Sequence, residues 1–130
     1  MPRATGTFDV KIGPLEHSAG DGTLGRLSLD KQFQGDFQGT AKGEMLTAGT
    51  SVKGSAVYVA IERVQGTVDG LSGSFAMHHT GVMTRGTPSL SISIVPDSGT
   101  DGLEGITGRL DIISEGKQHS YVLDYTLPGE

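Results

Sequence analysis

Two polar residues, Glu62 and His79, fall on one otherwise apolar strand face. Asp69-Gly70 between them is typical of a two-residue hairpin turn, in which both central residues take positive φ. Counting outward from this turn sets His79 opposite Ala60 and Glu62 opposite Met77, so Glu62 and His79 are diagonal neighbours. A carboxylate orients an imidazole and raises its basicity, so the pair could act as a general acid and base. A structural hydrogen bond between buried polar groups would have the same pattern.

Apolar and aromatic residues on the same faces predict an interior site for a small, largely apolar molecule. Tyrosines there could donate hydrogen bonds to a ligand carbonyl, although such tyrosines are more often core residues. Lys31 shares the face of Phe33 and either points inward or reaches water at the barrel mouth. Glu44 shares the Lys31 face if Gly35-Asp36 is a two-residue turn, and the opposite face if the turn has three residues. The candidate ligand-binding residues are Tyr58, Phe75, Met77, Tyr121, Tyr125, Lys31 and Glu44.

The elements that must position these residues are short strands. The 21 glycines punctuate stretches rich in β-branched and aromatic residues, and no segment keeps a helical apolar period for three turns. A loop is expected through Gly13, Pro14, Gly20, Asp21 and Gly22, and a turn at Glu115-Gly116 sets Leu110 opposite Tyr121. The predicted strands cover residues 8–12, 27–33, 41–47, 52–68, 71–83, 90–95, 103–113 and 119–127.

The face opposite to Glu62 is also apolar. It carries Val57, Val59 and Ile61, which we call the outer row. A contiguous apolar patch on an outer surface usually marks a contact with a partner. The outer row therefore predicts a homo-oligomer.

Composition excludes several classes of function. Ten basic residues against 15 acidic ones give a net charge of −5, and the basic residues are dispersed, so no nucleic-acid partner is expected. The absence of cysteine excludes disulfides and thiol catalysis. The chain lacks a signal peptide and an apolar run of about 18 residues, which predicts a cytoplasmic protein without membrane contact. His78 and His79 point to opposite faces of a strand, so we expect neither a metal nor another cofactor.

Six stretches carry a family resemblance, namely 31–36, 43–46, 58–64, 73–75 together with His79, 95–100 and 119–125. They resemble a small bacterial family of unknown function, which is similar to plant allene oxide cyclase and dirigent proteins. The resemblance implies an all-β, calycin-like fold, an eight-stranded antiparallel β-barrel with a central pocket, and association as a trimer. The plant enzymes act largely by holding an unstable apolar substrate in shape, and their pocket cysteine has no counterpart here.

We therefore expect residues 1–130 to form one β-barrel domain that binds a small, largely apolar molecule. As an enzyme it would be a cyclase or isomerase of a small apolar carbonyl or epoxide compound, with Glu62 and His79 as the catalytic pair. Two alternatives stay open. One is a non-catalytic carrier or sensor of a hydrophobic metabolite, and the other is a structural or interaction protein whose barrel is filled by side chains.

Overall fold

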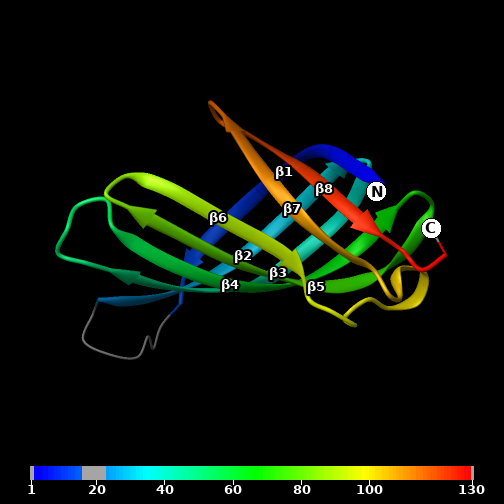
Figure 1. Cartoon of the computed structure of the whole chain (residues 1–130), viewed down its shortest axis with the longest axis horizontal. Helices are drawn as coiled ribbons and strands as arrows, with labels where there is room; N and C mark the ends of the chain where they lie inside the picture. Colours follow the sequence, from blue (N-terminus) through cyan, green and yellow to red (C-terminus); the bar gives the residue numbers. More distant parts are fainter. Residues whose placement is uncertain (1, 16–22, 130) are drawn as a thin grey trace.

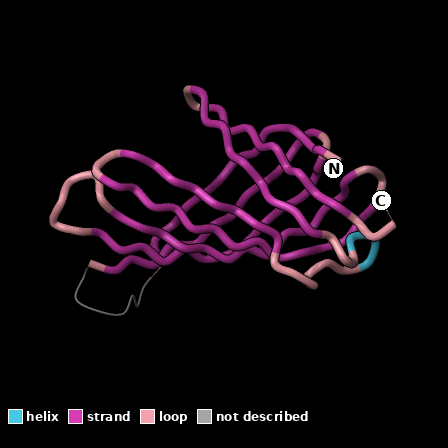
Figure 2. The backbone as a smooth tube through the Cα atoms, in the orientation of Figure 1, coloured by secondary structure: helices cyan, strands magenta, loops and turns pink. Residues whose placement is uncertain are grey.

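The computed structural model describes residues 2–15 and 23–129, and its strands form one closed antiparallel barrel (Figures 1 and 2). Each strand pairs with the next along the chain, and the first pairs with the last. The elements are β1 (Arg3–Pro14), β2 (Leu24–Gly35), β3 (Phe37–Gly49), β4 (Ala56–Val68), β5 (Leu71–Thr84), β6 (Thr87–Ile94), the 3₁₀ turn η1 (Asp101–Leu103), β7 (Thr107–Glu115) and β8 (Gln118–Thr126). The predicted eight-stranded all-β barrel is confirmed.

The β4–β5 hairpin has the predicted register. Asp69 and Gly70 have φ values of 51° and 75°, as a type I′ turn requires. Ala60 pairs with His79 and Glu62 with Met77. This turn is therefore the local feature that fixes the relative positions of Glu62 and His79.

The predicted register of the last hairpin is wrong by two residues. Its turn is Gly116-Lys117, and Leu110 pairs with Leu123 rather than with Tyr121. Positive φ occurs at Gly116, the first central position, which is the requirement of a type II′ turn. Because the side-chain period of a strand is two, the shift leaves each residue on its predicted face.

Several predicted boundaries also differ from the structure. The strand predicted from residue 52 begins at Ala56, because a turn with Gly54 at a φ of 81° precedes it. The strand predicted from residue 103 begins at Thr107. Leu103 and Ile106 are fully buried but lie in η1 and the turn after it, so their apolar character reflects packing into the core rather than a strand. Gly13 and Pro14 of the expected loop belong to β1, and residues 16–22 of it lie outside the described residues.

Side chains fill one end of the barrel. The ring centroids of Phe33 and Tyr121 lie 5.4 Å apart, and those of Phe37 and Phe75 lie 6.0 Å apart. All four residues are buried and belong to one core cluster. The interior at this end is therefore a packed core and not a cavity.

The other end of the barrel is open because β6 and β7 separate. Only Ser93 and Arg109 pair between these two strands, and beyond this contact the strands diverge (Figure 1). On the inner face of β6, Ile92 is 2% exposed whereas Leu90 is 44% exposed. The inner faces of β3–β6 thus continue past the packed core as an uncovered apolar surface.

Candidate functional site

Three charged or ionisable side chains meet inside the barrel and form what we call the ionic cluster. His79 Nε2 lies 2.8 Å from Glu62 Oε2, and Lys31 Nζ lies 2.9 Å from Glu62 Oε1. Their side chains are 2%, 0% and 7% exposed for His79, Glu62 and Lys31, respectively. The predicted contact between Glu62 and His79 is confirmed, and Lys31 takes the inward of its two predicted orientations.

Small residues on β3 allow Lys31 on β2 to reach Glu62 on β4. Ala41 pairs with Lys31, and Gly43 pairs with Glu62. A Cβ atom on Gly43 would collide with the carbonyl oxygen of Ile61, so only glycine fits there. The Lys31 side chain also passes the face of Phe8, with Nζ 5.6 Å from the ring centroid, a cation–π distance.

The cluster holds Glu62 as a carboxylate. Burial alone would raise the pKa of Glu62, but the hydrogen bond from His79 and the charge of Lys31 outweigh it, so the pKa is lowered. Because the carboxylate only accepts hydrogen bonds, His79 Nε2 must carry a hydrogen. In the uncharged form of the ring the lone pair lies on Nδ1, to which no described residue makes a hydrogen bond. His79 Nδ1 is therefore the atom of the cluster that can accept a proton.

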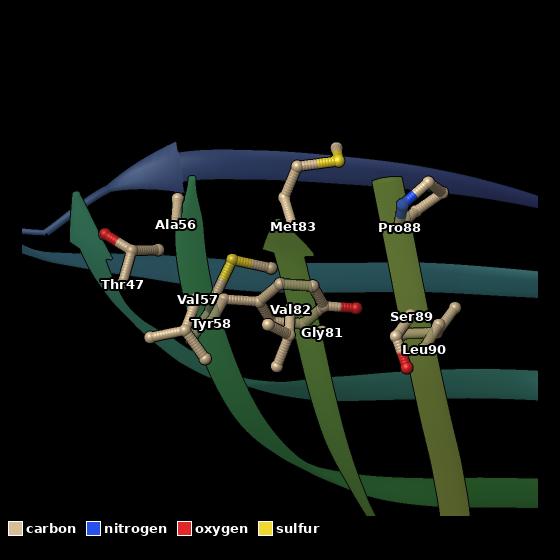
Figure 3. Close-up of a pocket in the computed structure, with 11 residues that line it drawn as sticks. Thr47, Ala56, Val57, Tyr58, Gly81, Val82, Met83, Pro88, Ser89 and Leu90 are labelled. Atoms are coloured by element: carbon tan, nitrogen blue, oxygen red, sulfur yellow. The ribbon is translucent and has the colours of Figure 1, made fainter. Parts of the chain in front are cut away.

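An apolar pocket of about 400 Å³ lies on the open inner face, and we call it the mouth pocket (Figure 3). This volume is within the range of small-molecule sites. Tyr58 connects it to the ionic cluster, since its ring centroid is 6.5 Å from that of His79. The inward-facing lining residues are Met45, Thr47, Ala56, Tyr58, Gly81, Met83, Pro88 and Leu90, and Val57, Val82 and Ser89 line the rim from positions whose side chains alternate to the outer face.

Four of the predicted ligand-binding residues lie in the packed core instead of the mouth pocket: Phe75, Met77, Tyr121 and Tyr125. The Tyr121 hydroxyl accepts from the Phe37 N–H at 2.9 Å, and its one hydrogen is shared between the carbonyl oxygens of Gln34 and Phe37, which lie 2.9 and 2.8 Å away. Tyr121 thus satisfies the backbone at the β2–β3 turn. Tyr58 is the predicted ligand-binding residue that lines the mouth pocket.

Glu44 lies on the outer surface. Phe33 pairs with Gly39, which centres the β2–β3 turn on Asp36 and corresponds to the three-residue alternative. Glu44 consequently faces outward, where Arg26 Nε donates to its carboxylate at 2.7 Å. It does not contribute to the ionic cluster.

The sequence reasoning missed most of the mouth pocket. Met45, Met83 and Leu90 follow the same alternation that places Tyr58 inward, so their face was accessible to prediction. Their exposure to solvent could not be predicted, because it depends on the separation of β6 and β7, which pair only at Ser93 and Arg109.

Residues 2–15 and 23–129 contain neither a cluster of metal-ligating side chains nor a membrane-spanning helix. No group of three or more His, Cys, Asp or Glu side chains there could hold a metal ion. No helix in the same residues has the length and apolar character needed to cross a bilayer.

Fold and site together define a small antiparallel β-barrel with a buried ionic cluster behind an apolar mouth pocket. The chain belongs to the DUF3224 family of proteins of unknown function, whose model matches residues 4–125. It is similar to a protein of unknown function from the same family of Shewanella oneidensis MR-1, known from a crystal structure at 1.84 Å. The two chains are 44% identical with a TM-score of 0.93, over 100% of this chain and 99% of that one.

These matches confirm the predicted membership of a family of unknown function. No curated protein matches the chain. The resemblance to allene oxide cyclase and dirigent proteins stays a prediction.

Proposed function

We propose that this barrel binds a small, largely apolar molecule in the mouth pocket and that the ionic cluster acts on it. One observation carries the proposal: the mouth pocket lies next to the ionic cluster, because Tyr58 lines the pocket and its ring also adjoins that of His79. An apolar pocket beside a few convergent polar groups is the usual form of a ligand site. A buried ionic cluster is also costly to desolvate, which favours a functional reason for its presence.

The chemistry that fits this arrangement is proton transfer in a cyclase or isomerase. His79 Nδ1 would take a proton from the substrate, and the resulting imidazolium would return it at another atom of the same molecule. Glu62 would stabilise the imidazolium, and Lys31 would keep Glu62 ionised. Such an isomerisation returns the proton it removes and transfers no electrons to or from the substrate, so it needs no cofactor. The resemblance to allene oxide cyclase supports a carbonyl or epoxide substrate.

We expect the neutral fluorophore N-phenyl-1-naphthylamine to bind the protein at one site. Replacing Leu90 by lysine should weaken this binding at least about tenfold, because the ammonium would have to be desolvated by the apolar ligand. Ile113→Lys is the matched control: Ile113 is 47% exposed and Leu90 is 44% exposed, but Ile113 does not line the mouth pocket. Fluorescence titration of the three proteins measures the dissociation constants.

The outcomes separate the three classes of function. Equal weakening by Leu90→Lys and Ile113→Lys would place the fluorophore elsewhere, and no binding would favour the structural or interaction protein with a filled barrel. If a molecule that co-purifies with the chain is released unchanged after incubation, the protein is a carrier or sensor. Conversion that stops in a His79→Gln variant identifies an enzyme.

We also propose that the chain forms a homo-oligomer, with a trimer favoured by the family resemblance. The supporting observation is the outer row, in which Val57, Val59 and Ile61 are 37%, 45% and 66% exposed. Leu46 pairs with Val59 and Val82 pairs with Val57, and both are exposed, so the apolar surface extends onto β3 and β5. Leaving such a patch in water costs about 25 cal/mol for each Å².

Sedimentation at micromolar concentration is expected to show an oligomer and no major monomer. Ile61→Asp should weaken association about 30-fold or more, as for a residue at the centre of an interface. Ile113→Asp, an exposed isoleucine on β7, should leave the oligomer intact. A monomeric parent protein would contradict the proposal.

A further inference from the structure

We infer that the mouth pocket takes a neutral molecule with one hydrogen-bond-accepting oxygen, and that the Tyr58 hydroxyl binds this oxygen. The inference rests on the proposed function and adds the chemical class of the ligand. It also assigns Tyr58 as the residue that orients the ligand relative to His79.

The lining of the pocket favours a neutral ligand. None of its eleven described residues is charged at neutral pH, and the polar side chains on its inward face are those of Thr47 and Tyr58. The nearby ionic cluster is already paired internally, with Glu62 bound by both Lys31 and His79. A carboxylate or ammonium on the ligand would therefore lose its hydration without gaining a counter-charge.

Among the hydroxyl groups at this pocket, that of Tyr58 is the one whose side chain also contacts the ionic cluster, through the ring of His79. It makes no hydrogen bond to any residue in the described part of the chain, whereas the Tyr121 hydroxyl is bonded to the backbone of Gln34 and Phe37. The hydroxyl is not sealed inside the protein, so water or a ligand oxygen at the pocket can reach it. Burial and the charge of Glu62 raise the pKa of Tyr58, so the phenol keeps its proton and can donate it to an acceptor oxygen of a ligand.

Gly81 fixes the position of this donor. It pairs with Tyr58 across β4 and β5, and a Cβ atom on Gly81 would overlap the Tyr58 ring. The ring thus lies directly on the backbone of β5. Figure 3 shows its hydroxyl directed across β5 toward β6, on the side of Ser89 and Leu90. A ligand oxygen bound to this hydroxyl would lie beside the ring that adjoins His79.

This geometry selects ketones, aldehydes, esters and epoxides over hydrocarbons and over acids. An apolar body would lie on Met45, Met83 and Leu90, and the thioether side chains can adapt to different shapes. The oxygen would lie at the Tyr58 end of the pocket. The carbon atoms next to that oxygen would then be the ones closest to the ionic cluster.

Three probes of nearly equal shape test the inference on the full chain: 2-acetonaphthone, its alkene analogue 2-isopropenylnaphthalene, and 2-naphthoate. Tyr58→Phe removes only the hydroxyl, so it should weaken binding of the ketone about threefold to tenfold and change binding of the alkene less than about twofold. Gly81→Ala should have the same selective effect, because the added methyl group displaces the ring. In the parent protein the carboxylate should bind at least about tenfold more weakly than the ketone.

A second measurement needs no variant. Labelling the tyrosine Cζ atoms gives three NMR signals, one for each tyrosine of the chain, and the ketone should shift the Tyr58 signal in particular. If Tyr58→Phe weakens ketone and alkene equally, or if 2-naphthoate binds as well as the ketone, the inference is wrong while the proposed pocket stands. If none of the three probes binds the parent protein, the proposed function fails as well.

Discussion

Replacing Glu62 by leucine is expected to destabilise the barrel by about 3–5 kcal/mol. The substitution leaves the Lys31 ammonium buried without a counter-charge, and it leaves the Nε2–H group of His79 without its acceptor. Both groups stay desolvated in the folded protein but regain water on unfolding, which is the source of the loss. Urea unfolding near neutral pH measures the change in the free energy of unfolding.

The control for this prediction is the removal of the whole ionic cluster. A triple variant with Lys31→Met, Glu62→Leu and His79→Phe leaves no buried charge, so its stability should equal or exceed that of the parent protein. Recovery of stability together with loss of ligand conversion would show that the cluster is retained for function at a cost in stability. A triple variant as unstable as Glu62→Leu would contradict this and favour a structural role.

The same variants differ in their response to acid. The pKa of Glu62 is lowered from its ordinary value of 4.5 in the folded protein, so its carboxylate is more favourable there than in the unfolded chain. The resulting stabilisation is present above that ordinary value and is lost as the pH falls through the lower, folded-state pKa. The parent protein should therefore lose more stability than the triple variant in that acidic range, as urea midpoints along a pH series would show.

The predictable part of the site is the part that a local turn determines. Asp69-Gly70 fixes the register of β4 and β5, and with it the contact between Glu62 and His79. The sequence does not determine the direction of Lys31, because a lysine on an inward face can also reach water at the barrel mouth. Its pairing with Glu62 depends on the small residues Ala41 and Gly43 of the strand between them. No local sequence pattern shows that these residues leave room for the Lys31 side chain.

The mouth pocket could not be predicted because it depends on the β6–β7 connection, which has no tight turn to fix how the two strands pair. Residues 95–106 link β6 to β7 through η1, and no hairpin sets the register between these two strands. Inner-face residues of β6 therefore look alike in sequence, yet Ile92 is buried and Leu90 is exposed. The three tyrosines are likewise indistinguishable until long-range contacts place the Tyr121 hydroxyl on the β2–β3 turn and leave that of Tyr58 at the pocket.

The second large change in stability is expected at Gly43, one of the small β3 residues that let Lys31 reach Glu62. We expect Gly43→Ala to destabilise the protein by about 3 kcal/mol or more, toward the upper end of overpacking effects. The added Cβ atom would meet the carbonyl oxygen of Ile61 and would lie 2.8 Å from the Cα atom of Glu62. Both are backbone atoms, so relief requires β3 and β4 to separate where they pair, and this displaces the Glu62 carboxylate from Lys31 and His79.

Gly49→Ala provides the matched control in the same strand. A Cβ atom on Gly49 has no heavy atom within 4 Å, so this substitution should change the free energy of unfolding by less than about 1 kcal/mol. Urea unfolding compares the two variants, and the NMR signals of the His79 ring report whether Glu62 has moved. If Gly43→Ala is as stable as Gly49→Ala and the His79 signals are unchanged, close packing at Gly43 does not position the ionic cluster. A large loss at Gly43 alone, with altered His79 signals, would show that the close contact of β3 and β4 holds Glu62 in place.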